Sequence, residues 1–600
     1  MILDALNIAW LHPGLLLILG AWILPLCKGL TKRVLMVAIP AAAVVICLGM
    51  TADTTFGEVS FLGLDVVFGR VDQLSLVFSY VFSIMALLGM IYALHLKDDS
   101  QHVTALTYAG GALGVTFAGD FISLYIFWEL MAISSALLVW QSREPDAGKA
   151  GFRYLLVHIV GGLILLAGIV MHVNSPNGSI SFENLGDFKH TAGWTLILIA
   201  FLINAAVPPL GAWLPDAYPE ASVTGAVFMT AFTTKSAIYV LIRGFPGTDM
   251  LIWLGAAMAV YGVVYAVLEN DARRLLAYHI ISQVGYMVCA VGIGTKLAIN
   301  GAASHAFAHI LYKALLFMGA GAVIQMTGRR KLSEMGGLYK TMPITLTLYM
   351  IGAFAISAVP LFSGFVSKSM IVSAAAEEHY TWIFLTLTLA SAGTFLHTGL
   401  KLPYYMFFGK DTGLQGKEPP TNMLVAMGLA AAACVLIGLF PNLLYQHLPN
   451  QPTADFEKYL PYTLHHVTST LGMLAFTALG FLLLLRQLDP EPKISLDTDW
   501  FYRRGASVFG RSIQQPLARF EGGYVGKACD FVMNRLVMRG AGYLRSFDTR
   551  IVDFTVVGVG RLTQALSQIL RTTVSGNAQH YALIMAAGVL ALLALAMIVL

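Results

Sequence analysis

The sequence has few charged residues for its length. Only 12% of its 600 residues are Asp, Glu, Lys or Arg, roughly half the share typical of a soluble protein. Hydrophobic residues make up 57% of the chain, and its mean hydropathy is +0.72. Apolar runs of about twenty residues therefore predict a bundle of membrane helices in contact with the lipid bilayer. The net charge of +4 is too small to indicate nucleic acid binding.

Cysteine is also scarce, and its spacing lacks any metal-binding pattern. No two of the five cysteines form a CxxC pair, and no His/Cys cluster accompanies them. Iron–sulfur and zinc sites are therefore not expected. No GxGxxG follows a predicted strand, so no cofactor is predicted, and redox cofactors of any larger complex would lie in partner subunits. The chain is not expected to be catalytic alone, although it could serve in the membrane arm of a redox-driven pump.

The apolar runs predict about sixteen membrane-spanning helices. Basic residues concentrate in alternate loops, and this bias places both termini outside the cytoplasm. The N-terminus lacks a basic region followed by a cleavage site, so its first apolar segment is expected to be retained. The predicted location is a cell membrane, taken as the bacterial plasma membrane. The spans are expected at 13–29, 34–50, 73–96, 103–119, 121–140, 152–173, 194–213, 222–242, 250–268, 275–294, 300–326, 343–376, 381–408, 421–440, 466–487 and 580–600.

Two of these spans contain residues that interrupt a helix. Pro208 and Pro209 lie in the span 194–213, and Pro360 and Gly364 lie in the span 343–376. A proline removes a backbone hydrogen bond and kinks the helix. In a bilayer such a break persists only against protein or a water-filled cavity. Each break alone could be a simple packing kink, but two breaks five spans apart favour an inverted-repeat transporter fold.

The carboxy-terminal region has a different composition. Residues 488–579 are rich in arginine, and apolar residues recur at helical spacing. This pattern predicts a lateral amphipathic helix on the cytoplasmic side, acting as a brace or docking arm, although a solvated linker is an alternative. We expect amino-terminal helices (1–100), a first antiporter-like half (101–245), a second half (246–410), additional helices (411–487), the lateral helix (488–579) and a final span (580–600).

Titratable side chains occur at mid-span depth, where a charge costs about 2.5–3.5 kcal/mol. His305, His309 and Lys313 are spaced at i, i+4 and i+8, so they share one face of a helix. Lysine, glutamate and histidine suit a proton relay because burial and neighbouring charges can bring their ionisation close to neutral pH. The predicted ion-translocating residues are Glu129, Lys235, His305, His309, Lys313 and Lys368, with Asn204, His397 and Lys401 as additional candidates.

Simpler interpretations exist for some of these residues. A lone histidine in a span is usually a satisfied core residue, although three on one helix face are harder to explain in this way. Lys401 lies close to the cytoplasmic end of its span. It is equally suited to anchoring the helix at the membrane interface.

Several stretches resemble the antiporter-like subunits shared by respiratory complex I, membrane-bound hydrogenases and Mrp-type cation/proton antiporters. They lie between about Val71 and Gly409 and include FWELM, TTKSAIYVLIR, DARRLLAYHIISQVGYM, HAFAHILYKALLFMGAG and AVPLFSGFVSKSMI. The stretch AWLPDAYPEAS is most similar to the D-type subunit of Mrp antiporters. In contrast, TDWFYRR and the arginine-rich segment resemble the long complex I subunit with a lateral helix.

The resemblance implies an all-α membrane protein with two inverted five-helix repeats, each with a broken helix. It also implies other membrane subunits as partners, and H+ or Na+ as the transported ion. By this resemblance Glu129 pairs with a lysine, Lys235 bridges the two halves and Lys368 is the basic residue of the second broken helix. The central relay would comprise His305, His309 and Lys313.

The sequence departs from this family at one important position. Asn204 stands in the first broken helix where the family usually has a lysine, and Gly211 replaces a polar residue. Glu129 could then pair with Lys235. Alternatively, Glu129 and Asn204 could bind sodium transiently through oxygen, or the first half could be inactive. Three functions therefore compete: an ion-translocating subunit, a non-pumping structural or coupling subunit, and a solute symporter.

Overall fold

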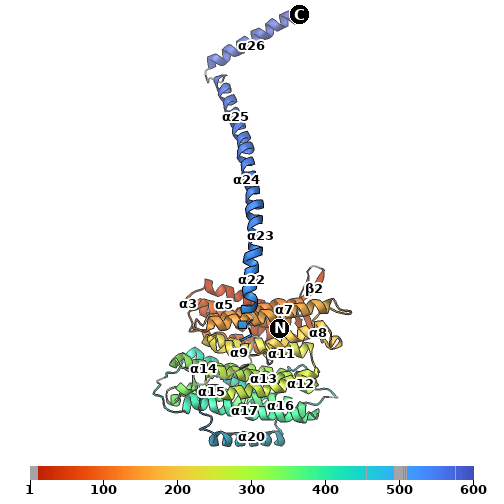
Figure 1. Ribbon diagram of the computed structural model, residues 1–600, viewed down its shortest axis with the longest axis vertical. Helices are drawn as coiled ribbons and strands as arrows, with labels where there is room; N and C mark the ends of the chain where they lie inside the picture. The colour runs from red at the N-terminus through yellow and green to blue at the C-terminus, as the bar shows by residue number, and fades with distance from the viewer. Residues whose placement is uncertain are drawn as a thin grey trace. The chain divides into compact units, whose positions relative to one another are not determined.

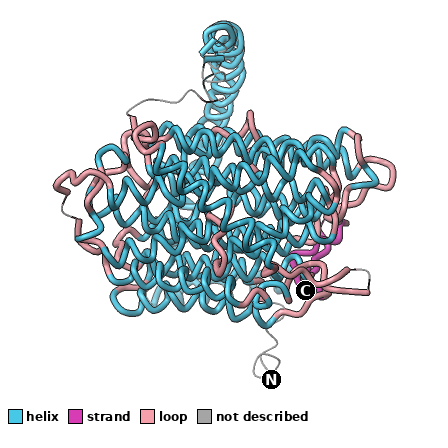
Figure 2. The backbone as a smooth tube through the Cα atoms, turned by 90° about the horizontal axis from the view of Figure 1, so that it is seen from below, coloured by secondary structure: helices cyan, strands magenta, loops and turns pink. Residues whose placement is uncertain are grey.

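The computed structural model divides the chain into two compact units, Met1–Trp500 and Phe501–Leu600. The first unit is a bundle of helices with one short β-hairpin (Figures 1 and 2). The second unit is helical. The structure describes residues 11–61, 63–414, 416–454, 456–491, 497, 500, 504–505, 507–508, 510–573, 576 and 578–599.

The β-hairpin lies at the edge of the helical bundle of the first unit (Figure 2). Strands β1 (Thr54–Phe61) and β2 (Leu64–Val71) are antiparallel, with Thr54 opposite Val71. The carboxylate of Asp120 accepts a 2.7 Å hydrogen bond from the backbone N–H of Val67. Asp120 also caps the next helix, so one side chain fixes the hairpin to the bundle. The sequence analysis contained no strand in this region.

Helices of the amino-terminal part and of the first half begin at aspartate caps where the chain leaves a loop. The side chains of Asp72, Asp98 and Asp120 each accept a backbone N–H at a helix start, which satisfies otherwise unpaired donors. The elements from the amino-terminal helices to the end of this half are α2 (Pro13–Ile23), η2 (Leu24–Leu26), α3 (Gly29–Gly49), α4 (Gln73–Ala93), α5 (Asp99–Phe117), α6 (Phe121–Trp140), α7 (Ala147–Val173), η3 (Gly186–Phe188), α8 (Ala192–Asn204), α9 (Trp213–Ala217), η4 (Tyr218–Glu220), α10 (Val223–Ala231) and α11 (Thr233–Gly244).

The second half is organised around one long buried helix, α14. This helix packs against α13, α16 and α18, and Figure 1 shows α13 and α14 side by side within the unit. The elements from this half to the end of the first unit are α12 (Asp249–Leu268), α13 (Ala272–Ile293), α14 (Lys296–Thr327), η5 (Leu332–Glu334), η6 (Leu338–Lys340), α15 (Pro343–Ile356), α16 (Ser363–Glu377), α17 (Thr381–Thr394), η7 (Phe395–Lys401), η8 (Tyr404–Phe408), α18 (Thr421–Leu439), α19 (Asn442–Tyr445) and α20 (Leu464–Leu483).

The two interrupted helices end with the same backbone geometry. Ala206 follows α8 with φ +58°, and Ala358 follows α15 with φ +56°. The next residue in each case, Val207 or Val359, donates its N–H to the carbonyl five residues earlier at 3.1 Å. Both ends are therefore Schellman caps, with alanine in the left-handed position that glycine usually occupies. This local repetition agrees with two related halves.

A glycine allows the chain to pass close to each cap. A Cβ atom on Gly211 would overlap the carbonyl oxygen of Ala206, and a Cβ atom on Gly364 would overlap that of Ala355. Only a residue without a side chain permits this approach. Glycine at 211, where the resemblance suggests a polar residue, therefore has a steric role in this fold.

Twelve helices in the described part of the chain are long and apolar enough to cross a membrane. Three shorter apolar helices, Pro13–Leu26, Ala192–Asn204 and Pro343–Ile356, join them. Two of the three are the first arms of the interrupted helices. The prediction of a multi-span, all-α membrane protein is confirmed, whereas the predicted count of about sixteen spans is not.

The second unit consists of consecutive α-helical and π-helical segments followed by one apolar helix. Its arginines and large apolar side chains are exposed where described. The elements are η9 (Gly510–Gln514), α22 (Gln515–Phe520), η10 (Glu521–Val525), α23 (Gly526–Phe531), η11 (Val532–Val537), α24 (Met538–Phe547), η12 (Asp548–Val552), α25 (Asp553–Thr573) and α26 (Ala578–Val599).

Candidate ion-translocation site

Helix α14 carries the centre of the candidate site. His305, His309 and Lys313 are completely buried on one face of this helix. The ring centroids of the two histidines are 6.2 Å apart. Three ionisable groups in one buried row are expensive to retain in a membrane core, which indicates a functional role for them.

Lys313 contacts a histidine that the sequence analysis missed. Its Nζ lies 3.2 Å from Nδ1 of His279 on α13. On the other side of the ring, Nε2 of His279 lies 3.2 Å from the hydroxyl of Thr394. An ammonium group can only donate, so Nδ1 of His279 accepts, and its Nε2 proton points to Thr394. His279 thereby joins Lys313 to α17.

Gln283 connects His279 to His305. The amide nitrogen of Gln283 donates a 3.3 Å hydrogen bond to the hydroxyl of Thr394, which also accepts from His279, and the carbonyl oxygen of Gln283 lies 3.2 Å from Nε2 of His305. The other ring nitrogen of His305 lies 3.1 Å from the hydroxyl of Ser367 on α16. Polar contacts therefore run from Lys313 through His279, Thr394, Gln283 and His305 to Ser367. In the sequence, His279 and Gln283 are four residues apart, which is the signal that could have identified them.

Lys368 lies beside the second helix break. Its ammonium group donates a 3.2 Å hydrogen bond to the carbonyl of Ile356, the last residue of α15. It also lies 5.1 Å from the ring centroid of Tyr286, and that ring is 6.0 Å from His305. The break thus exposes a carbonyl that an intact helix would use internally, and the buried lysine bonds to it.

A second branch leads from His279 to α17. The rings of His279 and His397 are 4.9 Å apart, edge to face. His397 and Lys401 both lie in the π-helical turn η7, a type of turn that is frequent at functional sites. Lys401 donates a 2.5 Å hydrogen bond to the carbonyl of Val267 at the end of α12. Of the three additional candidates, the structure therefore places His397 against His279, with Lys401 in the same π-helical turn.

Lys235 lies at the junction of α10 and α11. It is completely buried, and its ammonium group donates to the carbonyl of Thr230 at 2.8 Å and the hydroxyl of Thr234 at 3.1 Å. The end of α10 at Ala231 leaves the Thr230 carbonyl available. Helix α11, which carries Lys235, contacts α14, which carries His309. Neither ring nitrogen of His309 has a hydrogen-bond partner among the described residues, so this ring has unused bonding capacity.

Glu129 and Asn204 face α7 and lie apart from the series of polar contacts around Lys313. A Cβ atom on Gly162 would overlap Oε1 of Glu129, so the carboxylate rests directly on the glycine backbone. Within the described part of the chain, Oε1 of Glu129 and Oδ1 of Asn204 have no hydrogen-bond partner. No ion pair joins Glu129 to Lys235 among those residues. The direct pairing considered from the sequence is therefore absent from this structure.

Another buried histidine, His158, lies on α7 one turn before Gly162. It stacks on Tyr154 with ring centroids 4.0 Å apart and contacts Trp213 edge to face at 4.6 Å. The sequence analysis did not select it. Its Nδ1 lies 2.8 Å from the carbonyl of Tyr154, so it is partly satisfied by its own helix.

A cluster of ion pairs joins the two halves near their predicted cytoplasmic ends. Arg330 bonds to Glu220 at 2.9 Å and to Asp271 at 2.5 Å. Glu220 belongs to the segment that follows the first break, and Asp271 caps α13. The guanidinium group of Arg153 donates a bidentate pair of hydrogen bonds to the carboxylate of Asp216, at 2.6 and 2.8 Å. This geometry is the strong form of an arginine–carboxylate contact, and it anchors the segment after the first break.

Comparisons with known proteins agree on one family. The family model described as NADH:quinone oxidoreductase/Mrp antiporter, TM, matches residues 118–394. This range includes the polar contacts around Lys313 and both helix breaks. The chain is similar to the D-type subunit of the Na(+)/H(+) antiporter of Alkalihalophilus pseudofirmus, with 32% identity over 56% of this chain and 72% of that protein. It is 30% identical to an uncharacterized protein of Methanocaldococcus jannaschii, over 71% of this chain and 94% of that one.

A third relative and two solved structures extend the match. NAD(P)H-quinone oxidoreductase chain 5 of a Picosynechococcus species is 28% identical over 87% of this chain and 85% of that protein. A chain of the Mrp complex from Dietzia has a TM-score of 0.61 at 22% identity, covering 79% of this chain and 96% of that one. A chain of an archaeal membrane-bound sulfane sulfur reductase has a TM-score of 0.64 at 23% identity, covering 74% and 95%. The chain therefore belongs to the family of NADH:quinone oxidoreductase and Mrp antiporter membrane subunits.

Proposed function

We propose that this chain translocates protons within a multisubunit membrane complex, either a cation/proton antiporter or a redox-driven pump. One observation carries the proposal: a contiguous row of buried ionisable and hydrogen-bonding side chains. The row runs from Lys313 through His279, Thr394, Gln283 and His305 to Ser367, beside Lys368.

The chemistry of the row suits proton transfer better than binding of a metal cation. Lysine ammonium groups lie at both ends, and they repel a cation such as sodium at short range. Neutral imidazole can accept a proton at one nitrogen and release one at the other. Members of the row are separated by hydrogen-bond distances, so protons can move without large displacement of helices.

The names of the relatives support a multisubunit setting. One relative is a subunit of a Na(+)/H(+) antiporter and another is a chain of a quinone oxidoreductase. The solved relatives belong to an Mrp complex and a respiratory membrane complex. We therefore propose other membrane subunits as partners of this chain, with any redox cofactor held by those partners.

Two side chains of the first half make sodium a candidate for a second transported ion. The unpartnered oxygens of Glu129 and Asn204 are hard donors of the kind that sodium prefers. A sodium ion bound there transiently would be cargo of the transporter. The same unpartnered state also fits an inactive first half, in which the chain would couple conformations without pumping. The solute symporter remains the weakest candidate because no constellation for an organic ligand was found in the sequence.

Proton flux in vesicles tests the central proposal. The full complex containing Lys313→Ala or Lys368→Ala should lose at least about 90% of its cation-driven or redox-driven proton flux, because a missing relay member removes an acid–base step. His172→Gln provides a matched control, since His172 is buried but packs between Phe121 and Phe188, outside the row. Normal flux in both lysine variants, with the complex assembled, would refute the proposal and leave the structural role.

A further inference from the structure

Three buried polar atoms of the first half lie around helix α7 without a hydrogen-bond partner. Within the part of the chain that the structure describes, they are Oε1 of Glu129, Oδ1 of Asn204 and Nε2 of His158. A buried polar atom without a partner costs about 1–3 kcal/mol. Three such atoms around one helix indicate a ligand or a proton that binds there during function.

Helix α7 brings the three atoms into one region. A Cβ atom on Gly162 would overlap Oε1 of Glu129, and one on Gly161 would lie 3.9 Å from Oδ1 of Asn204. His158 precedes Gly162 by one turn, about 6 Å along the helix axis. A water molecule with two hydrogen bonds of ordinary length spans about 5–6 Å. This spacing therefore suits a single water molecule between the imidazole ring and the carboxylate.

The hydrogen bond from His158 to its own helix determines which ring nitrogen is basic. Nδ1 lies 2.8 Å from the carbonyl oxygen of Tyr154, and a carbonyl oxygen only accepts. The proton of the neutral ring is therefore on Nδ1, and Nε2 has a free lone pair. All three atoms without a partner are thus acceptors, so the group that satisfies them must supply a hydrogen or a positive charge.

The surroundings of His158 suit an imidazolium ion. Its ring stacks on that of Tyr154 with centroids 4.0 Å apart and contacts the indole of Trp213 with centroids 4.6 Å apart. Aromatic rings within about 6 Å attract a cation. The indole N–H of Trp213 donates to the carbonyl of Ile203 at 3.0 Å, so it does not occupy Nε2 of His158.

Hydroxyl groups connect this region with Lys235. The hydroxyl of Tyr154 lies 3.3 Å from that of Thr233. The ammonium group of Lys235 donates a 3.1 Å hydrogen bond to the hydroxyl of the residue that follows Thr233. Along α7, His158 therefore lies between the contact towards Lys235 and the contact with Glu129.

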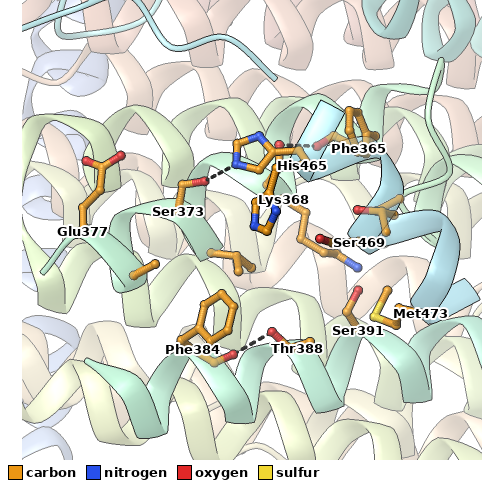
Figure 3. A pocket seen from close by; sticks show the side chains of 16 residues that line it. Phe365, Lys368, Ser373, Glu377, Phe384, Thr388, Ser391, His465, Ser469 and Met473 are labelled. Carbon is orange, nitrogen blue, oxygen red and sulfur yellow. Dashed lines mark hydrogen bonds between the residues drawn. The ribbon is translucent and has the colours of Figure 1, made fainter. Parts of the chain in front are cut away.

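The two halves differ in the side chain beside the helix break. In the second half, Lys368 lines a cavity of about 400 Å³, and Figure 3 shows it among serine and threonine side chains. In the first half, Asn204 is the last residue of the helix before the break, and its amide carries no exchangeable charge. His158 supplies the basic nitrogen that this amide lacks.

We propose that His158 and Glu129 share one transferable proton and form the proton-carrying pair of the first half. This inference rests on the proposed proton translocation and adds a residue to it. Neutral His158 takes up a proton at Nε2 and becomes an imidazolium ion. The proton then passes through one water molecule to the carboxylate of Glu129, which leaves a neutral ring and a neutral carboxylic acid. A sodium ion would use the two oxygens but not the imidazole nitrogen, which is a ligand of transition metals.

Proton flux of the full complex in vesicles tests the pair. His158→Gln and His158→Asn both remove the basic ring, and each amide can still donate to the carbonyl of Tyr154. We expect both variants to lower flux at least threefold, to the level of Glu129→Gln. The double variant His158→Gln/Glu129→Gln should fall no further, because residues that act as a unit are not additive. His172→Gln is the control, since His172 is buried further along the same helix, and it should keep parental flux.

A lysine at position 204 provides the second test. Asn204→Lys in the His158→Gln background places an ammonium group beside α7, and we expect it to recover at least half of the lost flux. Asn204→Met in the same background has a similar length without the charge and should recover none. The subunit content and unfolding midpoint of every complex are measured alongside flux.

Parental flux in both His158 variants would overturn the inference, and so would a double variant whose loss equals the product of the two single losses. Loss of the assembled complex in both His158 variants, without recovery by Asn204→Lys, would assign His158 a structural role instead. If Lys313→Ala abolishes flux while the His158 variants keep it, the proposed function stands and this pair alone is refuted. An assembled parent complex without proton flux refutes both.

Discussion

The ammonium group of Lys313 lies 3.2 Å from Nδ1 of His279, on a neighbouring helix. Both side chains are completely buried. A hydrogen bond to a buried charged group typically contributes about 1.5–3 kcal/mol, so this contact stabilises the fold and also provides a transfer step. The two roles can be separated by substitution.

His279→Gln should separate them. Glutamine can still accept from Lys313, so we expect the thermal unfolding midpoint of the complex to change little. It cannot take up a proton near neutral pH, so proton flux should fall at least about tenfold, as expected for loss of a general acid–base group. Flux in vesicles and thermal unfolding measure the two effects. A parallel loss of flux and stability would instead indicate a structural role for His279.

Ala358→Gly should stabilise the protein. Ala358 has φ +56° in the cap of α15, a conformation that costs an L-residue about 1 kcal/mol and glycine almost nothing. We expect a higher unfolding midpoint in detergent. Ala353→Gly, inside the same helix, is the matched control and should lower the midpoint, because glycine destabilises a helix interior by about 1 kcal/mol. If both variants shifted the unfolding midpoint in the same direction, the left-handed cap conformation of Ala358 would be contradicted.

Gly162→Ala tests whether the first half carries ions. The added methyl group would occupy the position of Oε1 of Glu129, so the carboxylate must move. We expect cation-coupled transport to fall several-fold. Gly148→Ala is the control, because Gly148 lies on the same helix with open space around it. Unchanged transport in Gly162→Ala would assign all translocation to the second half.

Glu269 should make stability depend on pH. It caps the end of α12, where burial raises the pKa of its carboxyl group to about 7, with Arg274 opposing and Asp271 adding to the rise. The unfolded chain releases this proton near its ordinary value of 4.5. The fold therefore loses stability as pH rises from about 4.5 to about 7, by at most about 3 kcal/mol.

Glu269→Gln should remove this loss. The variant is expected to unfold at a higher temperature than the parent protein at pH 8 and at a similar temperature at pH 5. Scanning calorimetry or a dye-based unfolding assay at both pH values provides the measurement. The exposed Glu457→Gln should change neither value. A Glu269→Gln variant that is no more stable at pH 8 would argue against a buried, largely protonated carboxyl group.

Local sequence patterns were enough to predict the helical content and the three titratable residues on one face of α14. The spacing of His305, His309 and Lys313 depends only on helix geometry, and the structure places all three on one buried face. The proline-containing breaks also follow from local chemistry. Both features are properties of a single segment, and single segments are what a sequence describes best.

Contacts between segments could not be predicted in this way. His279 becomes part of the row because α13, α14 and α17 pack together, and Lys368 finds the Ile356 carbonyl across the break. The β-hairpin was missed because its strands are stabilised by pairing with each other and by Asp120. In each example the decisive interaction joins residues that are far apart in the chain or on different segments.

The double contact of Arg330 limits how the two halves can move. Its guanidinium group holds Glu220 from one half and Asp271 from the other at the same time. Transporters that alternate access by rocking one repeat against the other must separate such cross-links in every cycle. A mechanism based on side chains and water leaves them intact. Arg330 therefore cross-links the two halves. Its contacts favour a mechanism in which protons move along side chains and water while the two halves keep their relative positions.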